Sequence, residues 1–236
     1  MKLVSIVPVA DIAHTFDGPY AMMLTHLAEA DYYPECKNPN CYKILDNSLI
    51  ELGGAVDIDR VLAAAYKIKA DEIILPDMFR DGIRSYELAE KYSKELHERN
   101  IPFRMMAVCH GRTKEEFEEC FHKLEKLPYI HCIGIPKVSE ELTPTGRPGL
   151  EYLWANSTKT IHLLGCWTNM HELIEYKNPQ KIRSCDTCIP ALNSNYNLGA
   201  FDDRPHKTID LVKDKINWPE YDKIIDTMRK YHLIGE

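Results

Sequence analysis

Short apolar runs alternate with longer segments of helical spacing along most of this chain. Runs typical of strands cover residues 2–10, 42–48, 71–78, 103–111, 130–138 and 160–167, and a seventh begins at Ile182. Apolar runs without polar alternation indicate strands that are covered on both faces, as in parallel sheets with helical crossovers. Seven such units in 236 residues predict an α/β fold, a single (β/α)8 barrel domain over residues 1–236, rather than an open doubly wound sheet.

Two parts of the pattern are less regular. Residues 20–31 have helical spacing, so the eighth strand is expected near residues 207–213. After the strand that begins at Ile182, Pro190 and a series of asparagines predict a long loop rather than a helix. Residues 218–232 predict a closing helix with Pro219 in its first turn.

Composition and charge exclude several classes of protein. Hydrophobic residues make up 44% of the chain and charged residues 28%, which is ordinary for a globular domain. The formal net charge of −7 excludes the strong positive field of a sequence-independent nucleic-acid coat, but not a local basic rim. The first apolar run is too short for a secretory signal and no segment is long enough to span a membrane, so we expect a cytoplasmic protein without a membrane partner.

The eight cysteines predict reduced thiols rather than disulfides, because the chain has no secretory signal. Cys36 and Cys41 flank four residues, and Cys185 and Cys188 form a C-x-x-C pair. A four-thiolate zinc site is an alternative, although the first spacing is loose and the second pair interrupts a predicted strand. A redox dithiol would have to open a helix. We therefore expect no metal and no other cofactor, with the zinc site left open.

Polar residues and glycines follow the predicted strands at their C-terminal ends, where a (β/α)8 barrel carries its active site. They are Asp46, Asp77, His110, Gly134, Lys137, Gly165 and Asp186. A single acid at such a place is more simply explained as a cap of the following turn, but three acids and a histidine at one rim favour a shared site. Asp186 is expected at the mouth of a loop, without a buried partner.

Paired carboxylates are the chemistry that this rim offers. The chain has no P-loop, no G-x-S-x-G and no H-E-x-x-H motif. Two aspartates that face one pocket can transfer a glycosyl group by double displacement, in which one attacks the anomeric carbon and the other moves protons.

Residues 161–197 resemble the corresponding stretch of tRNA-guanine transglycosylases. Leu163, Leu164 and Gly165 match the family's Tyr-Leu-Met-Gly segment, and Asp186 with Pro190 match its Phe-Asp-Cys-Val-x-Pro segment. Weaker matches lie upstream, at "YKILDNS", "ILPDM", "MAVCHG" and "IGIPK".

The resemblance implies a role for each matching residue. Asp186 would be the nucleophile that displaces guanine and holds the sugar, and Asp46 would be the general acid/base. Asp77 would accept hydrogen bonds from N1–H and the exocyclic amine of guanine, a pattern of donors that adenine lacks. The other residues of the implied substrate-binding set are Phe79, His110, Gly134, Lys137 and Gly165.

Departures from the family pattern point to DNA as the substrate. Asn47 and Ser48 replace the glycines after the family's first acid, and His110 replaces its glutamine. The chain is also shorter and lacks the C-terminal Cys-rich zinc motif of the tRNA enzymes. These losses point to the compact phage relatives of the DpdA type, which exchange guanine in DNA for a 7-deazaguanine such as 7-cyano-7-deazaguanine. The resemblance then implies the host cytoplasm as the location and leaves open whether the protein is a homodimer.

A base in duplex DNA must be flipped into the pocket or met in single-stranded form. The candidates for phosphate contacts are Arg80, Arg112, Lys137, Arg147, Arg183 and Arg204. The candidate stacking platforms are Phe79, Trp167 and Tyr196, of which Phe79 is favoured because it lies next to Asp77. For each cation an ordinary surface charge is the simpler explanation, and each aromatic ring could belong to the core.

Three alternatives remain from the sequence. The same exchange could act on tRNA, or the barrel could be a glycosidase or transferase that uses these carboxylates on a small nucleoside or sugar phosphate. A non-catalytic zinc module is the third.

Overall fold

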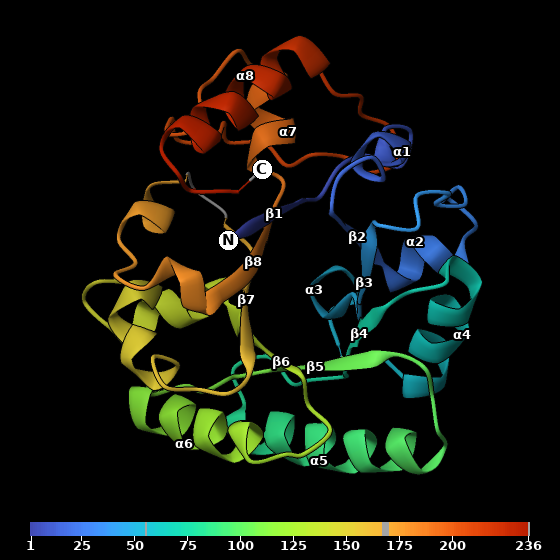
Figure 1. The fold of residues 1–236 in the computed structure, drawn as a ribbon, viewed down its shortest axis with the longest axis vertical. Helices are drawn as coiled ribbons and strands as arrows, with labels where there is room; N and C mark the ends of the chain where they lie inside the picture. The colour runs from blue at the N-terminus through green and yellow to red at the C-terminus, as the bar shows by residue number, and fades with distance from the viewer. Residues whose placement is uncertain (55, 167–169, 236) are drawn as a thin grey trace.

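The computed structural model describes residues 1–54, 56–166 and 170–235. Its strands form one parallel sheet that curves into a ring, in the order β1-β8-β7-β6-β5-β4-β3-β2 (Figure 1). They are β1 (Lys2–Ser5), β2 (Tyr20–Leu24), β3 (Tyr42–Asp46), β4 (Glu72–Ile74), β5 (Arg104–Val108), β6 (Cys132–Pro136), β7 (Thr160–Leu164) and β8 (Ile182–Thr187). β1 and β2 are the two ends of the sheet. They lie side by side but are not joined by a ladder of backbone hydrogen bonds, so the barrel is nearly closed. The predicted (β/α)8 fold is confirmed.

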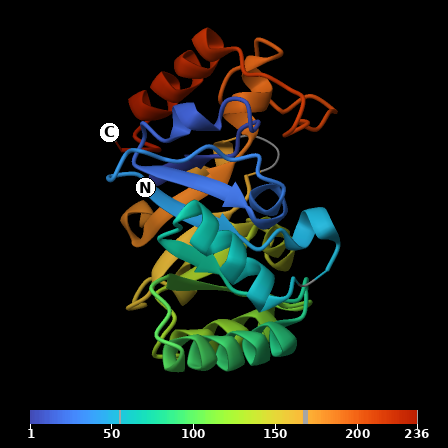
Figure 2. The ribbon, with the colours of Figure 1, turned by 90° about the vertical axis from the view of Figure 1, so that its right-hand side faces the viewer.

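Three long helices cover the outside of the ring after β3, β4 and β5: α4 (Ile58–Ile68), α5 (Gly82–Glu98) and α6 (Lys114–Glu125). Figure 2 shows α5 and α6 packed together at one end of the molecule. The side chains of Asp57, Asp81 and Thr113 cap these helices by accepting a hydrogen bond from a backbone N–H of the first turn. These caps therefore determine the residue at which each of the three helices begins.

The other helical segments are short, apart from one at the C-terminal end. They are α1 (Ile12–Thr15), α2 (Thr25–Glu29), α3 (Leu49–Leu52), η1 (Lys137–Leu142), η2 (Arg147–Leu153), η3 (His171–Ile174), η4 (Pro179–Lys181) and α7 (Ile189–Ser194), followed by α8 (Trp218–Lys230). α3 lies over the inside of the ring in Figure 1. α8 is the predicted closing helix, and Pro219 lies in its first turn as expected.

The predicted position of the eighth strand was wrong. The segment Tyr20–Leu24 forms β2, which pairs with β3 from Tyr20↔Tyr42 to Leu24↔Asp46. Only the second part of residues 20–31 is helical, and residues 207–213 form no strand. A run of buried apolar residues fits a buried strand as well as a helix, so the pairing with β3 decides the outcome.

The prediction of a long loop after β8 was wrong for residues 189–194, whereas residues 195–217 form no helix or strand. Helix α7 begins at Ile189, with Pro190 in its first turn, where the missing N–H would have no partner within the helix. Asn193 is fully buried, and its Nδ2 donates to the carbonyls of Gly199 and Asp202. Asn193 therefore holds the chain after α7 in place.

The interior of the barrel is partly apolar and partly polar. Val4, Met22, Ile44, Ile74, Met106, Val108 and Cys132 form its apolar cluster. His162 and Ser184 are completely buried at paired positions of β7 and β8. Ile161 and Leu163, on either side of His162, pack in the outer core between strands and helices, so His162 points inward.

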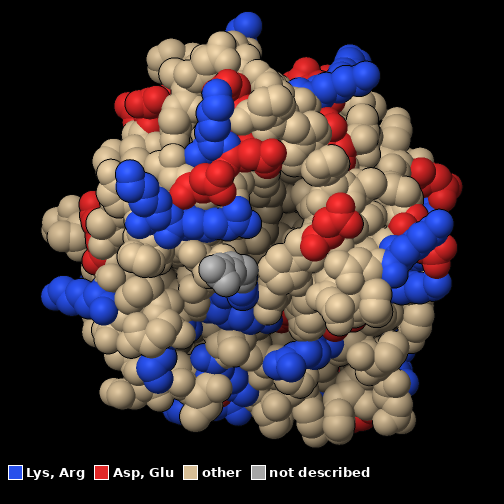
Figure 3. Space-filling model, turned by 45° about the horizontal axis from the view of Figure 1, so that its top comes forward, with Lys and Arg blue, Asp and Glu red and all other residues tan. Residues whose placement is uncertain are grey.

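Within the described residues, no helix is long and apolar enough to cross a membrane. Figure 3 shows one face of the molecule, where Lys and Arg side chains lie among Asp and Glu side chains.

Gly111 offers a test of how tightly β5 and α6 are joined. A Cβ at this position would lie 2.5 Å from the backbone nitrogen of Phe117 and 2.7 Å from its Cα. Because backbone must shift to admit a methyl group, we expect Gly111→Ala to lower the free energy of unfolding by about 1–3 kcal/mol. The control is Gly54→Ala, where a Cβ has nothing within 4 Å and the change should stay within about 0.5 kcal/mol. Urea denaturation measures both, and equal values would contradict the packing described.

Candidate active site

One cavity of about 150 Å³ opens among the C-terminal ends of the strands. The predicted site residues that line it are Asp46, Asp77, Phe79, His110, Lys137, Gly165 and Asp186. Gly134 is not among the lining residues. A Cβ on Gly134 would lie 2.8 Å from Leu164 Cδ1, so the glycine makes room for Leu164, which does line the cavity.

Asp186 is buried at the end of β8, and one of its two carboxylate oxygens accepts two hydrogen bonds. Its Oδ1 accepts hydrogen bonds from His162 Nε2 and from the backbone N–H of Gly165, each at 3.0 Å. Gly165 has a φ of +69°, a left-handed conformation that favours glycine. Among the described residues no hydrogen bond to Oδ2 is present. The expectation that Asp186 has no buried partner was therefore wrong.

A buried hydrogen-bond chain sets the tautomer of His162. Arg183 Nε donates to Ser184 Oγ at 3.2 Å, so the Ser184 hydroxyl has its own proton free to donate to His162 Nδ1 at 2.7 Å. In the neutral ring, the proton is then on Nε2, which donates to Asp186. At its far end, Arg183 is paired with the buried Glu72 at 2.7 Å.

Asp46 lies at the end of β3 in a different electrostatic setting. Burial raises the pKa of this carboxyl group well above its usual value, and the carboxylates of Glu51, Asp186 and Asp77 add to the effect. The backbone N–H of Ser48, which donates to Asp46 Oδ1 at 2.6 Å, opposes it. Asp46 therefore keeps its proton to a higher pH than an exposed aspartate does.

Asp77 and His110 form a second buried pair. His110 Nε2 lies 2.6 Å from Asp77 Oδ2, and the backbone N–H of Arg80 donates to His110 Nδ1 at 3.3 Å, which places the ring proton on Nε2. Asn47 Nδ2 donates to Asp77 Oδ1 at 2.6 Å and to the carbonyl of Leu75 at 2.8 Å. Asn47 thus holds Asp77 in place.

Phe79 and Lys137 occupy the mouth and the wall of the cavity. The Phe79 ring is 43% exposed and meets the His110 ring edge-on at 6.0 Å between centroids. Lys137 is only 7% exposed, and its Nζ lies 2.7 Å from Glu140 and 2.8 Å from Glu172.

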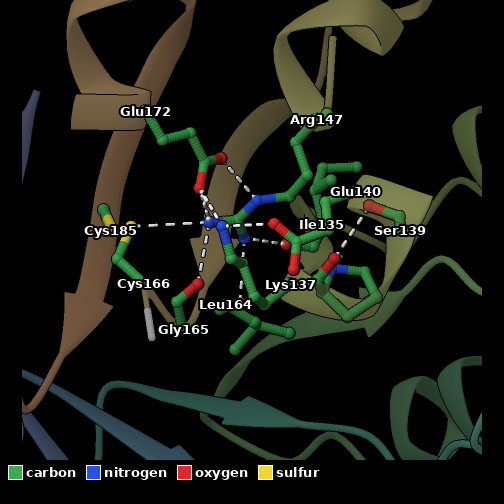
Figure 4. Close-up of polar contacts among 12 residues, drawn as sticks. Ile135, Lys137, Ser139, Glu140, Arg147, Leu164, Gly165, Cys166, Glu172 and Cys185 are labelled. Atoms are coloured by element: carbon green, nitrogen blue, oxygen red, sulfur yellow. Dashed lines mark hydrogen bonds and ion pairs between the residues drawn. The ribbon is translucent and has the colours of Figure 1, made fainter. Parts of the chain in front are cut away.

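Arg147 connects the ends of β6 and β7 through hydrogen bonds, as Figure 4 shows. Its guanidinium group is fully buried and donates to the carbonyls of Ile135, Leu164 and Gly165 at 2.7–2.9 Å. It also pairs with Glu172 at 2.6 Å. Burial alone would raise the pKa of Glu172, but the positive charges of Arg147 and Lys137 outweigh it and lower that pKa to about 2.

Several predicted nucleic-acid contacts do not line the cavity, although Arg80 lies beside the lining residue Phe79. Arg147 is buried against Glu172, and Arg183 lies near the start of β8, at the opposite end of the barrel from the cavity. The residues that do not line the cavity also include Arg80, Arg112, Tyr196 and Arg204. Trp167 lies outside the described residues.

The cysteines do not gather into one group. Cys41 comes before β3, whereas Cys185 lies in β8, which is not a neighbour of β3, and its Sγ is 3.3 Å from that of Cys166. No cluster of three or more Cys, His, Asp or Glu side chains that could hold a metal ion is found in residues 1–54, 56–166 and 170–235.

Sequence reasoning missed three residues that shape the site: Asn47, Glu51 and His162. Asn47 directly follows Asp46, and Glu51 lies in α3, which lines the cavity. A histidine inside the apolar run "TIHLL" was the available signal for His162, because a buried polar residue in a strand needs partners. Those partners become visible only when β7 and β8 are placed in register.

Comparisons with known proteins support the fold alone. No protein-family model matches the chain, and neither does any curated protein sequence. The crystal structure of the YdjI aldolase from Escherichia coli K12 is similar over 100% of this chain and 91% of its own, with a TM-score of 0.52 and 10% identity. The BexX/CysO complex from Amycolatopsis orientalis is similar over 80% of each chain, with a TM-score of 0.51 and 10% identity. At such identity, a likeness indicates a shared barrel architecture and no shared substrate.

The raised pKa of Asp46 predicts a pH-dependent gain in stability for Asp46→Asn. The folded state holds this proton above the pH at which the unfolded chain releases it, so the free energy of unfolding falls as the pH rises through that window. Each unit of pKa elevation corresponds to about 1.4 kcal/mol, which the variant does not lose. Thermal unfolding should show Asp46→Asn more stable than the wild type at pH 8, with the difference shrinking towards pH 4. The exposed control Asp17→Asn should show no such trend, and a flat difference for Asp46→Asn would contradict the burial effect.

Proposed function

We propose that this protein is a base-exchange enzyme that replaces guanine in DNA with a 7-deazaguanine, such as 7-cyano-7-deazaguanine, through a covalent aspartyl-sugar intermediate. The observation that carries the proposal is the difference between two carboxyl groups on one cavity. Asp186 has two donors on one oxygen and, within the described residues, none on the other, whereas Asp46 has a raised pKa. Such a pair supplies a nucleophile and a proton donor to the same substrate.

In the first half of the reaction, Asp186 Oδ2 attacks C1′ of a deoxyguanosine nucleotide in the DNA. The bond between C1′ and N9 breaks, its electron pair leaves with guanine, and the neutral Asp46 carboxyl group gives the base a proton. The two donors on Asp186 Oδ1 direct the free oxygen towards the sugar. The product is a sugar joined to Asp186 by an ester-type bond.

In the second half, a 7-deazaguanine occupies the place of guanine. Asp46, now ionised, takes the proton from N9 of the incoming base, N9 attacks C1′, and Asp186 is released. The nucleophilic displacement happens twice, so the configuration at C1′ is retained. No metal or cofactor is needed to balance either half.

Asp77 and Phe79 are suited to select and hold the base. Both Asp77 oxygens already accept one hydrogen bond, from Asn47 and His110, and each has capacity for a second from N1–H or the exocyclic amine of guanine. The half-exposed Phe79 ring offers a stacking surface at the cavity mouth. Exchange on tRNA, or transfer on a small nucleoside or sugar phosphate, would use the same carboxyl groups and is separated by the choice of substrate below.

Trapping of the intermediate tests the nucleophile. Wild-type protein mixed with labelled guanine-containing DNA, without an incoming base, should give a covalent adduct on denaturing electrophoresis that disappears when 7-cyano-7-deazaguanine is added. Asp186→Asn should form none, although its amide oxygen can keep the bonds from His162 and Gly165 and so preserve the fold. An adduct that persists in Asp186→Asn would contradict the assignment of Asp186 as the nucleophile. Parallel reactions with tRNA and with free deoxyguanosine show which substrate is used.

His162 should act as a positioning residue for Asp186. His162→Leu removes one of the two donors to Oδ1, and loss of a hydrogen bond to a charged group lowers the rate of adduct formation about 10- to 150-fold. His162→Gln can place an amide N–H near the position of Nε2 and should restore most of the rate. DNA affinity should not change in either variant. Equal rates in the leucine and glutamine variants would contradict a positioning role.

A further inference from the structure

We propose that Lys137 and Arg80 form a site for two phosphate groups at the cavity mouth, and that Glu140 and Glu141 cover this site in the free protein. The inference rests on the proposed base exchange and names its substrate class. The substrate would be a nucleotide with a phosphate on both sides of its sugar, as within a nucleic-acid strand, rather than a free nucleoside or a mononucleotide.

Lys137 is a pre-organised cation on the cavity wall. Its Nζ is held on one side by Glu172, which Arg147 fixes through Nε and Nη2 at 2.6 and 3.0 Å and which Tyr176 also contacts at 2.7 Å. The ammonium group has three N–H donors, of which Glu172 and Glu140 take two. The desolvation of Lys137 is therefore already compensated before any ligand arrives.

Glu140 is the replaceable partner of Lys137. Its side chain is 44% exposed, whereas that of Glu172 is 10% exposed, and Figure 4 shows it reaching Lys137 from the side opposite Glu172. Water reaches the Glu140 carboxylate directly, so solvation compensates this group when it leaves Lys137. A phosphate oxygen can take the place of the Glu140 carboxylate without leaving Lys137 unpaired.

Arg80 repeats this arrangement next to the base platform. Its Nη2 pairs with Glu141 at 2.6 Å, and both side chains are largely exposed. The guanidinium carbon lies 5.5 Å from the centre of the Phe79 ring, which lines the cavity. Within the described part of the chain, Arg80 Nε is a buried donor without a partner, so the guanidinium has hydrogen-bonding capacity that Glu141 does not use.

The two acids are neighbours in the chain, which couples the two cations. Consecutive Cα atoms lie about 3.8 Å apart, so one short segment of η1 reaches both Lys137 and Arg80. Two negative groups at neighbouring positions imitate two successive phosphates. When a nucleic-acid strand binds, its phosphates therefore replace the carboxylates of Glu140 and Glu141. Lys137 and Arg80 each keep a negative partner.

Calorimetric titration with three ligands tests the proposal without relying on catalysis. The ligands are deoxyguanosine 3′,5′-bisphosphate, 5′-dGMP and deoxyguanosine, and the wild type should bind the bisphosphate most tightly. The double variant Glu140→Gln/Glu141→Gln should bind it about 2- to 20-fold more tightly, because two carboxylates that compete with the phosphates are lost. Binding of deoxyguanosine should not change. Arg80→Gln should weaken the bisphosphate towards the affinity of 5′-dGMP.

Glu119→Gln is the control, since it removes an exposed carboxylate, paired with Lys123 at 2.7 Å, from the outer helix α6. An equal gain in this control would assign the effect to net charge and overturn the proposal. So would equal affinity for the bisphosphate and 5′-dGMP. If the bisphosphate behaves as expected but no adduct forms at Asp186, the phosphate site stands and the exchange reaction fails. If the adduct forms and the glutamate variants change nothing, only the phosphate site fails.

Discussion

Two hydrogen bonds to one oxygen of Asp186 organise the candidate site. A buried carboxylate needs donors to offset its lost hydration, and His162 and Gly165 supply them from β7 and the turn that follows it. Because both reach Oδ1, the described residues place no hydrogen bond on the other oxygen, which is the one proposed to react. The histidine is in turn oriented by Ser184 and Arg183, so a polar chain inside the barrel determines how the carboxylate faces its substrate.

The buried cation Arg147 connects this arrangement to the cavity wall. Its guanidinium group is held from several sides, because it donates to the carbonyls at the ends of β6 and β7 and pairs with Glu172. One of those carbonyls belongs to Gly165, whose N–H holds Asp186. Glu172 also holds Lys137, so the proposed nucleophile and the proposed phosphate contact share one support. The positions of Asp186 and Lys137 are therefore not independent in this barrel.

The sequence was sufficient for the barrel and for most of the rim, because strand ends in a parallel barrel converge whatever their exact register. Asp46, Asp77, His110 and Asp186 were placed together in this way. Residues 20–24 were predicted as part of a helix, because a short apolar run fits a helix as well as a buried strand. Their pairing with β3 makes them a strand. The pairing of His162 with Asp186 and the burial of Arg147 depend on contacts between segments far apart in the chain, which no local pattern contains.

The central claim is that Asp186 becomes covalently bonded to the sugar while Asp46 only moves protons. Peptide mapping by mass spectrometry measures this directly on wild-type protein that has been mixed with guanine-containing DNA in the absence of an incoming base. The account predicts that digestion of protein and DNA leaves a deoxyribose-bearing fragment on the peptide that contains Asp186. A sugar found on the peptide that contains Asp46, or active base exchange with no modified peptide, would contradict it.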